Sequence, residues 1–340
     1  MAAGFAGAAA LALVLAGCSS GKDTGGSTAG GATPGAGATK SGALEIVYLQ
    51  KQGDQQYFVD EANGAKAEGD KLGNVKVTVV SLGTDSNKAI SELDSAIARK
   101  VDGIVMVAPD QAIGPQVIDK AKQAGIPFLA SDDILKDSSG TPAAFVGFDG
   151  TAMGNAVGQK AAELYKTAGW TAADTKVLSV YKEDLSVCKQ RVDGAKASFQ
   201  KTAGELPEVI DVGTDNSVTD AINKAGATIT AHLDVKHWVV WGCNDEGETG
   251  VVTALQNAGI QPANIIGVGL GAYLTCKDWK ANQQTGNKAA LYISGVDVGT
   301  SAIQVMVDQI RNGKQLPAQT IATTHMVDAT NWQQEGVSCT

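Results

Sequence analysis

Short apolar runs alternate with amphipathic stretches along most of the chain. Residues 86–98 carry apolar side chains at positions 89, 90, 93, 96 and 97, the spacing of an amphipathic helix. Similar spacing predicts helices at residues 58–72, 86–98, 113–124, 187–199, 218–233, 247–258 and 300–311. The apolar runs predict buried strands at residues 44–49, 75–80, 103–108, 126–130, 177–180, 209–212, 238–241 and 265–268.

Strands that alternate with helices of this length form βαβ units, in which helices cover both faces of a parallel sheet. There are too many units for one small sheet, so we predict an α/β fold of two Rossmann-like lobes joined by a hinge. The N-terminal lobe is predicted to hold residues 44–148 and about 294–318, and the C-terminal lobe residues 149–293 and about 319–340. A Thr-rich segment, residues 319–326, is a candidate strand that could cross back between the lobes.

The N-terminus carries a short apolar run that ends in Leu15, Ala16, Gly17 and Cys18. The run is too short to span a bilayer, which takes about 20 residues, and the small residues after it are typical of a secretory cleavage site. The final cysteine gives the pattern of a lipobox, so we predict cleavage before Cys18 and lipidation of its thiol. An ordinary apolar start with a chance cysteine is the alternative. No Lys or Arg precedes the run, which points to a start further upstream.

Residues 19–43 are almost entirely Gly, Ser, Thr and Ala, a composition that buries too little apolar surface to fold. We predict a flexible linker between the lipid anchor and the folded part. The formal net charge is -9 with no basic run, which argues against nucleic acid as a partner.

Four cysteines remain if Cys18 is lipidated: Cys188, Cys243, Cys276 and Cys339. An even number in an exported protein favours disulfides, and four cysteines allow three pairings. We predict at least one bridge and favour Cys243 with Cys276, because both follow predicted strands in the same half. None of the cysteine spacings is typical of a metal site, and no metal is expected.

Ligands of open parallel sheets bind at the carboxyl ends of the strands. In the first half these ends carry Lys51, Gln55 and Tyr57, and later Asp132 and Asp133. Carboxylates, amides and a stacking ring suit a polyhydroxylated ligand. We place Tyr57 at the cleft and its neighbour Phe58 in the core, while a solvated turn or helix cap is the alternative for the two aspartates.

In the second half, Leu185 leads into a helix with Arg191, and Cys243 and Asn244 follow a strand. The guanidinium of Arg191 could bridge two ligand oxygens, although a surface ion pair is the stronger interpretation of that residue alone. Asn244 fits a ligand contact and a helix N-cap equally well. The three histidines are scattered and the chain shows no nucleophile elbow or P-loop, so no catalytic residue and no cofactor are predicted.

The folded part resembles the type I periplasmic sugar-binding proteins of ABC importers, and among them the L-arabinose binders. The resemblance covers about residues 44–331 and depends on five segments that match in order and spacing: residues 51–58, 131–133, 185–191, 238–245 and 265–269. It implies that Lys51, Asp133, Arg191 and Asn244 hydrogen-bond a sugar and that Tyr57 stacks on it.

The chain departs from those binders at five positions that the resemblance places in the pocket. It has Gln55 for a glutamate, Tyr57 for a tryptophan, Gly271 for an asparagine, and Phe148 and Cys243 for methionines. The side chains of the pocket therefore differ from those of the L-arabinose binders, and a pentose, a hexose or a sugar alcohol would fit.

The resemblance implies a non-enzymatic, monomeric, extracytoplasmic receptor that closes two lobes on a monosaccharide and delivers it to an ABC permease. The membrane is contacted only through the lipid anchor. Two alternatives stay open: a sugar-sensing lipoprotein that feeds a receptor kinase, and an exported α/β enzyme.

Overall fold

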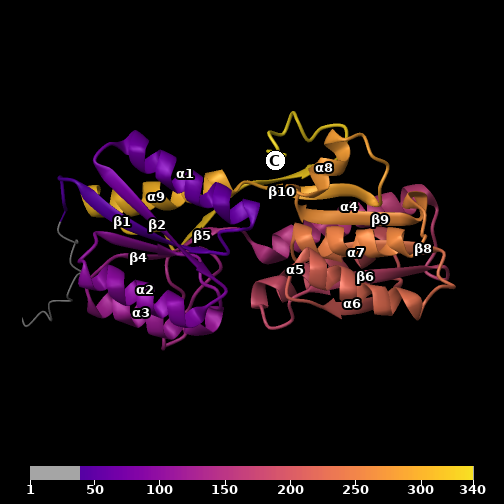
Figure 1. Cartoon of the computed structure of the whole chain (residues 1–340), viewed down its shortest axis with the longest axis horizontal. Helices are drawn as coiled ribbons and strands as arrows, with labels where there is room; N and C mark the ends of the chain where they lie inside the picture. Colours follow the sequence, from indigo (N-terminus) through magenta and orange to yellow (C-terminus); the bar gives the residue numbers. More distant parts are fainter. Residues whose placement is uncertain (1–38, 340) are drawn as a thin grey trace, which may run out of the picture. The chain divides into compact units, whose positions relative to one another are not determined.

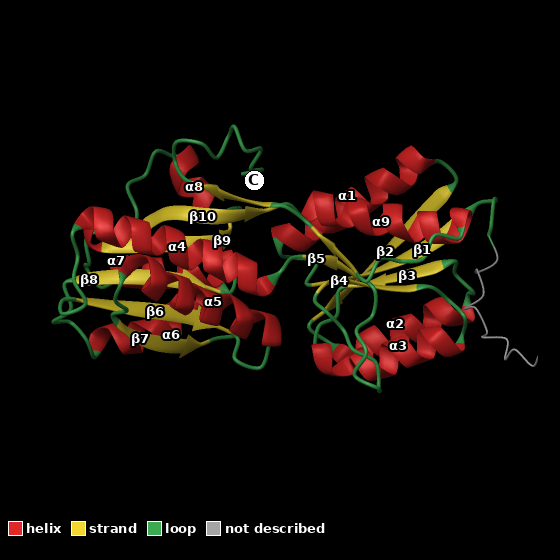
Figure 2. Cartoon of the chain, turned by 180° about the vertical axis from the view of Figure 1, so that it is seen from behind, coloured by secondary structure: helices red, strands yellow, loops and turns green. Residues whose placement is uncertain are grey.

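Two six-stranded sheets with helices on their faces make up the part of the chain that a computed structural model describes, residues 39–339 (Figures 1 and 2). The predicted α/β class with two parallel-sheet lobes is confirmed. The predicted lipobox with Cys18 and most of the predicted linker lie outside the described residues.

The first sheet has the strand order β11-β5-β4-β3-β1-β2, and all neighbouring strands in it are parallel. Its strands are β1 (Leu44–Lys51), β2 (Val75–Gly83), β3 (Gly103–Met106), β4 (Phe128–Asp132), β5 (Phe145–Gly147) and β11 (Gln319–Ile321). On β1, Ile46 and Tyr48 enter one buried cluster, while Val47 and Leu49 enter another. Successive side chains of a strand point to opposite faces, so both faces of this sheet are buried at β1, whereas the edge strands β2 and β11 are partly exposed.

The second sheet has the order β12-β10-β9-β8-β6-β7, with β12 antiparallel to β10 and the other pairs parallel. Its strands are β6 (Thr175–Tyr181), β7 (Glu208–Gly213), β8 (His237–Gly242), β9 (Ile265–Gly271), β10 (Asn287–Ile293) and β12 (Thr324–Val327). The single strand predicted at residues 319–326 is therefore wrong, because β11 and β12 belong to different sheets. The chain crosses between the sheets at Ala322 and Thr323.

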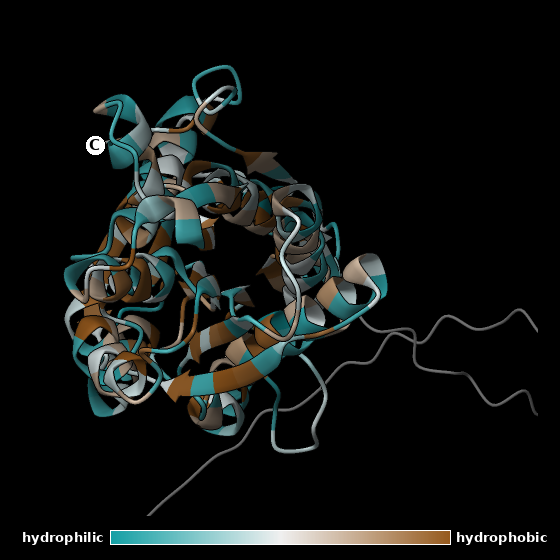
Figure 3. Cartoon of the chain, turned by 90° about the vertical axis from the view of Figure 1, so that its right-hand side faces the viewer, coloured by the Kyte–Doolittle hydropathy of each residue, from teal (hydrophilic) through white to brown (hydrophobic). Residues whose placement is uncertain are grey.

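Helices cover both sheets, and apolar segments, drawn in brown, occur on strands and helices alike (Figure 3). They are α1 (Gln56–Leu72), α2 (Ser86–Ala98), α3 (Gly114–Gln123), α4 (Gly150–Ala168), α5 (Ser186–Ala203), α6 (Val218–Thr230), α7 (Asp245–Asn257), α8 (Thr275–Lys280) and α9 (Gly295–Asn312), with 3₁₀ turns at Gln111–Ile113 and Pro262–Asn264. We call the first sheet with α1, α2, α3 and α9 the first lobe, and the second sheet with α4 to α8 the second lobe. The chain passes between the lobes after β5, after β10 and after β11. The last crossing lies at Ala322 and not at the predicted boundary between residues 318 and 319. With that boundary moved, the predicted division into two lobes stays a proposal.

Two helix pairs pack with their backbones in direct contact. A Cβ atom added at Gly158 of α4 would lie 2.1 Å from the backbone oxygen of Ala195 on α5, and one at Gly299 of α9 would lie 1.9 Å from the backbone oxygen of Glu61 on α1. Figure 1 shows α9 beside α1, although the two helices are distant in sequence. The buried face of α4 combines glycines with Met153, Val157, Ala161 and Tyr165 at helical spacing, and this helix was not among the predicted ones although its apolar pattern is present in the sequence.

Gly158→Ala is expected to lower the free energy of unfolding by about 1–3 kcal/mol, because the added methyl group must push α4 away from α5. The matched control is Gly226→Ala on α6, where a Cβ atom meets nothing within 4 Å. That change should stabilise the protein by about 0.5–1 kcal/mol through helix propensity alone. Urea denaturation of both variants measures the difference, and equal effects would contradict the close contact.

Candidate functional site

A small cavity of about 60 Å³ lies where strand ends of both lobes meet. Its first-lobe walls come from the segments that follow β1 and β4, and its second-lobe walls from those that follow β6, β7 and β8. The lining residues are Lys51, Gln52, Gln55, Phe58, Asp132, Asp133, Leu185, Val187, Cys188, Arg191, Asn216, Cys243 and Asn244. The structure thus brings together eight of the predicted binding residues: Lys51, Gln55, Asp132, Asp133, Leu185, Arg191, Cys243 and Asn244.

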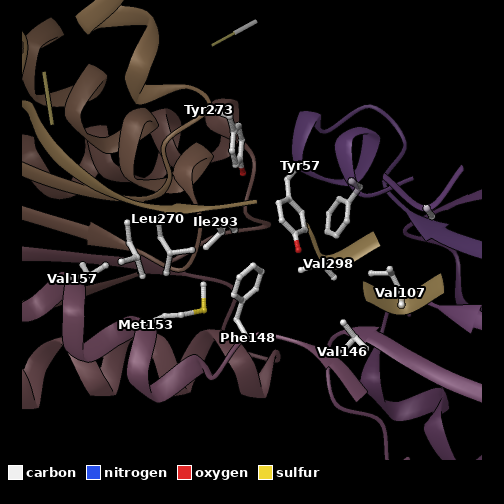
Figure 4. Packing of buried hydrophobic residues seen from close by; sticks show 14 of the residues in the cluster. Tyr57, Val107, Val146, Phe148, Met153, Val157, Leu270, Tyr273, Ile293 and Val298 are labelled. Carbon is white, nitrogen blue, oxygen red and sulfur yellow. The ribbon is translucent and has the colours of Figure 1, made fainter. Parts of the chain in front are cut away.

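The three other predicted residues lie outside this lining. Tyr57 is buried beside Phe148 with its ring centre 6.4 Å away, in the apolar cluster drawn in Figure 4. Phe148 lines a neighbouring cavity of about 410 Å³ instead. At Gly271 a Cβ atom would meet the ring of Tyr273 at 2.3 Å, so no side chain fits where the family resemblance implied an asparagine.

Tyr57 and Phe58 both belong to the buried apolar cluster, which confirms the predicted core position of Phe58, but only Phe58 also borders the cavity. Phe58 lines it, with its ring centre 6.0 Å from the ammonium group of Lys51. The hydroxyl of Tyr57 donates to Oδ1 of Asp132 at 3.2 Å, and burial, followed by the charge of Asp132, raises the pKa of Tyr57 so that it stays a donor. Helix α1 begins at Gln56, two positions before the predicted start at 58, and Tyr57 is buried in its first turn instead of lining the cavity.

The first-lobe wall carries acidic groups with unequal surroundings. Asp133 accepts from the ammonium group of Lys51 at 3.3 Å through Oδ2, while its Oδ1 is buried with no hydrogen-bond partner among residues 39–339. Asp132 has a φ of 62°, a left-handed conformation that is costly for a residue with a side chain. Burial, followed by the charge of Asp133, raises the pKa of Asp132, against the lowering effect of Arg191 and Lys51.

A buried carboxyl group lies beneath this wall. Glu61 of α1 accepts hydrogen bonds from the hydroxyls of Tyr48 and Ser131, which come from β1 and β4. Burial, followed by the charge of Asp132, raises the pKa of Glu61 to about 8. At neutral pH, Glu61 is therefore mostly protonated and adds little negative charge behind the two aspartates.

The second-lobe wall presents a donor and an acceptor. Arg191 donates through Nη1 to the backbone oxygen of Cys243 at 2.9 Å, and its Nε is buried without a partner among the described residues. Oδ1 of Asn216 is also buried without a hydrogen-bond partner among the described residues, and Asn216 has a left-handed φ of 68°. Asn216 is not among the predicted site residues, and its one signal in the sequence is its place shortly after β7.

Asn244 is the N-cap of α7, as the alternative interpretation held. Its Oδ1 accepts from the backbone N–H of Gly247 at 3.1 Å, and its Nδ2 donates to the backbone oxygen of Asn216 at 2.8 Å and to Oε2 of Glu246 at 2.7 Å. Both amide hydrogens are therefore used within the protein. Burial, followed by the charge of Asp245, raises the pKa of Glu246 to about 7.

A comparison with known proteins shows the family to which this chain belongs. A family model described as a periplasmic binding protein domain matches residues 46–315. The chain belongs to the periplasmic binding proteins. The ABC transporter L-arabinose-binding periplasmic protein of Azospirillum brasilense is 32% identical over 87% of this chain and 90% of its own length. The L-arabinose-binding periplasmic protein of Escherichia coli is 24% identical over 86% and 90%.

Solved structures agree with the fold. An ABC transporter solute-binding protein from Burkholderia graminis, crystallised in complex with D-arabinose, is similar with a TM-score of 0.74 at 19% identity, covering 89% of this chain and all of its own. The relatives are binding proteins of transporters, so the prediction of a non-enzymatic protein is confirmed. Among residues 39–339 there is no helix of the length and apolarity needed to cross a membrane, and no cluster of three or more side chains that could hold a metal ion.

Two disulfides join the four cysteines that this periplasmic binding protein has among residues 39–339. The pairs are Cys188 with Cys243 and Cys276 with Cys339, so the favoured pairing of Cys243 with Cys276 is wrong. Cys243 faces the first turn of α5, whereas Cys276 lies under the C-terminal tail with Trp332 and Val337. The sulfur of Cys243 reaches the cavity as part of a bridge and not as a free thiol.

The raised pKa of Glu61 predicts a pH-dependent stability. A carboxyl group whose folded pKa lies above its unfolded value binds a proton on folding, so stability falls as pH rises from about 4.5 to about 8 and then levels off. We expect Glu61→Gln to flatten this decline, because the amide does not ionise. Urea midpoints at pH 5, 7 and 9 measure it.

Glu68→Gln on the same helix is the matched control. Although burial acts to raise its pKa, hydrogen bonds from Gln304 and Lys71 leave the pKa of Glu68 lowered. The stability that Glu68 contributes is lost only as pH falls below the ordinary pKa of a glutamate. Glu68→Gln should therefore keep the wild-type dependence of the urea midpoint on pH between pH 5 and 9. A Glu61→Gln variant with that same slope would contradict the assignment.

Proposed function

We propose that this protein is the extracytoplasmic receptor of an ABC sugar importer and binds a monosaccharide in the cavity between its lobes. One observation carries the proposal: Oδ1 of Asp133, Nε of Arg191 and Oδ1 of Asn216 are buried around one cavity without partners among residues 39–339. A buried polar atom left unpaired costs about 1–3 kcal/mol. A ligand rich in hydroxyl groups satisfies all three, since each hydroxyl both donates and accepts.

The aromatic and amide groups of the cavity support the same ligand class. The ring of Phe58 offers an apolar surface against which the C–H face of a sugar packs, and Gln55 adds a neutral amide that donates and accepts. Named relatives bind L-arabinose, D-xylose and D-allose, according to their descriptions. We therefore propose a pentose, a hexose or a sugar alcohol as the ligand.

Closure of two lobes explains how such a receptor signals its loaded state. The unpaired atoms come from both lobes, so a ligand satisfies all of them only when the lobes are closed on it, and binding shifts the population toward that form. Oγ of Ser186 donates to Oε1 of Gln111 at 2.6 Å, a hydrogen bond that also joins the two lobes. The permease would then recognise the closed form.

Asp133→Ala is expected to weaken monosaccharide binding at least tenfold, because it removes the acceptor that faces the cavity and leaves Lys51 without its partner. Isothermal titration calorimetry against L-arabinose, D-xylose, D-galactose and ribitol measures the affinity. Asp193→Ala, on the exposed surface of α5, is the matched control and should bind as the wild type does. Wild-type affinity in Asp133→Ala, or no binding of any of these ligands to the wild type, would refute the proposed site.

We further propose that the protein is a lipoprotein anchored through Cys18, with residues 19–43 as the tether. The support is the lipobox at Leu15 to Cys18, and two acyl chains or more are what stable anchoring requires.

In a bacterial host, Cys18→Ala should abolish incorporation of radiolabelled palmitate and move the protein from the membrane fraction to the soluble fraction. Ser19→Ala, which leaves the lipobox intact, serves as the control and should remain labelled. Palmitate labelling that persists in Cys18→Ala would exclude this anchor.

A further inference from the structure

The Cys188–Cys243 disulfide forms part of the wall of the cavity. Cys188 lies in the first turn of α5 and Cys243 directly follows β8, and both residues line the cavity. Their exposed fractions are 1% and 2%, so the bridge is covered by the protein around it. It therefore ties the helix that carries Arg191 to the strand end that carries Asn244.

Each sulfur of this bridge contacts one of the two second-lobe side chains that line the cavity and have unpaired atoms. Nη1 of Arg191 lies 3.8 Å from Sγ of Cys243, and Nδ2 of Asn216 lies 3.4 Å from Sγ of Cys188. Nδ2 of Asn244 adds a hydrogen bond to the backbone oxygen of Asn216 at 2.8 Å. These contacts leave Nε of Arg191 and Oδ1 of Asn216 unpaired at the cavity.

We infer that the Cys188–Cys243 disulfide is a positioning element for ligand recognition, which holds Arg191 and Asn216 in the conformation that the ligand needs. The inference rests on the proposed sugar site. An arginine side chain has many rotamers, and Asn216 occupies a left-handed conformation that is costly by itself. A bridge that fixes both before binding removes the entropy that the ligand would otherwise have to offset.

The second disulfide provides a matched control within the same chain. Cys276 and Cys339 are 63 residues apart, against 55 for Cys188 and Cys243, so the two bridges constrain the unfolded chain to nearly the same extent. Cys276 packs with Trp279 and Trp332, and neither Cys276 nor Cys339 lines the cavity. Loss of either bridge should cost similar stability, but loss of the first alone should cost affinity.

The test compares Cys188→Ser/Cys243→Ser with Cys276→Ser/Cys339→Ser by thermal melting and by calorimetry against L-arabinose, D-xylose, D-galactose and ribitol. We expect both variants to melt at lower temperature by similar amounts. The first should bind its ligand at least tenfold more weakly than the wild type, and the second within twofold. Equal affinities of the first variant and the wild type would overturn the inference, whereas a wild type that binds none of the ligands would overturn the proposed function itself.

A measurement on the wild-type protein keeps the test decisive if the first variant does not fold. Dithiothreitol transfers two electrons and two protons to each bridge, which becomes two thiols while the reagent closes to its cyclic disulfide. Coupling between two equilibria is reciprocal, so a bridge that strengthens sugar binding tenfold is itself made harder to reduce by about 30 mV when sugar is bound. Thiol trapping and peptide mass spectrometry across a dithiothreitol series measure both bridges in one sample.

The expected result is a shift for Cys188–Cys243 on addition of the bound sugar that exceeds the shift for Cys276–Cys339. A ligand that merely stabilised the whole fold would protect both bridges equally. Equal shifts, or no shift for either bridge, would therefore overturn the positioning role.

Discussion

A charged or polar group that is taken out of water must find a partner, and this requirement shapes the strand ends of both lobes. Asp133 is paired with Lys51, while Glu61 lies deeper and has its pKa raised to about 8. Arg191 meets the requirement only in part, through the backbone oxygen of Cys243. Three of the side chains with unpaired buried atoms, Asp133, Arg191 and Asn216, line one cavity, and the cost of burying these atoms would favour a ligand in the proposed site.

Backbone strain gathers at the same edge. Gln52, Asp132, Asn216 and Ala272 adopt left-handed φ values, and each lies at or shortly after the end of a parallel strand. Such conformations persist only where the surrounding structure over-determines them. Here the buried strands and the closely packed helix pairs α1 with α9 and α4 with α5 supply that rigidity. The scaffold thereby holds polar side chains in positions that a free loop would not keep.

Periodicity and strand order predicted much of the fold and part of the site. The apolar runs located β1 and β8, and the rule that ligands lie at strand ends correctly grouped Lys51, Asp133 and Arg191 around one cavity. These patterns could not predict which side chain of the first helical turn borders the cavity, because whether Tyr57 or Phe58 does so depends on where α1 begins.

Pairings over long distances in sequence could not be predicted either. The disulfide partners of Cys243 and Cys276 depend on how α5 and the C-terminal tail pack, which no local pattern records. The packing of α4 against α5, through close backbone contacts at Gly158 and the ring pair Tyr165 and Phe199, also joins segments that no local pattern pairs. Asn216 has no signal of its own beyond its place after a strand.

The late return of the chain to the first lobe has a consequence for how the protein is made. Helix α9 and strand β11 come after five of the six strands of the second sheet, yet they complete the helix layer and the edge of the first sheet. The first lobe therefore cannot finish folding until residues near 320 have left the ribosome, and contacts this distant in sequence form slowly. A polypeptide that must be threaded through a membrane before it folds gains from this order of events, because its N-terminal half stays incomplete and loosely structured during the passage.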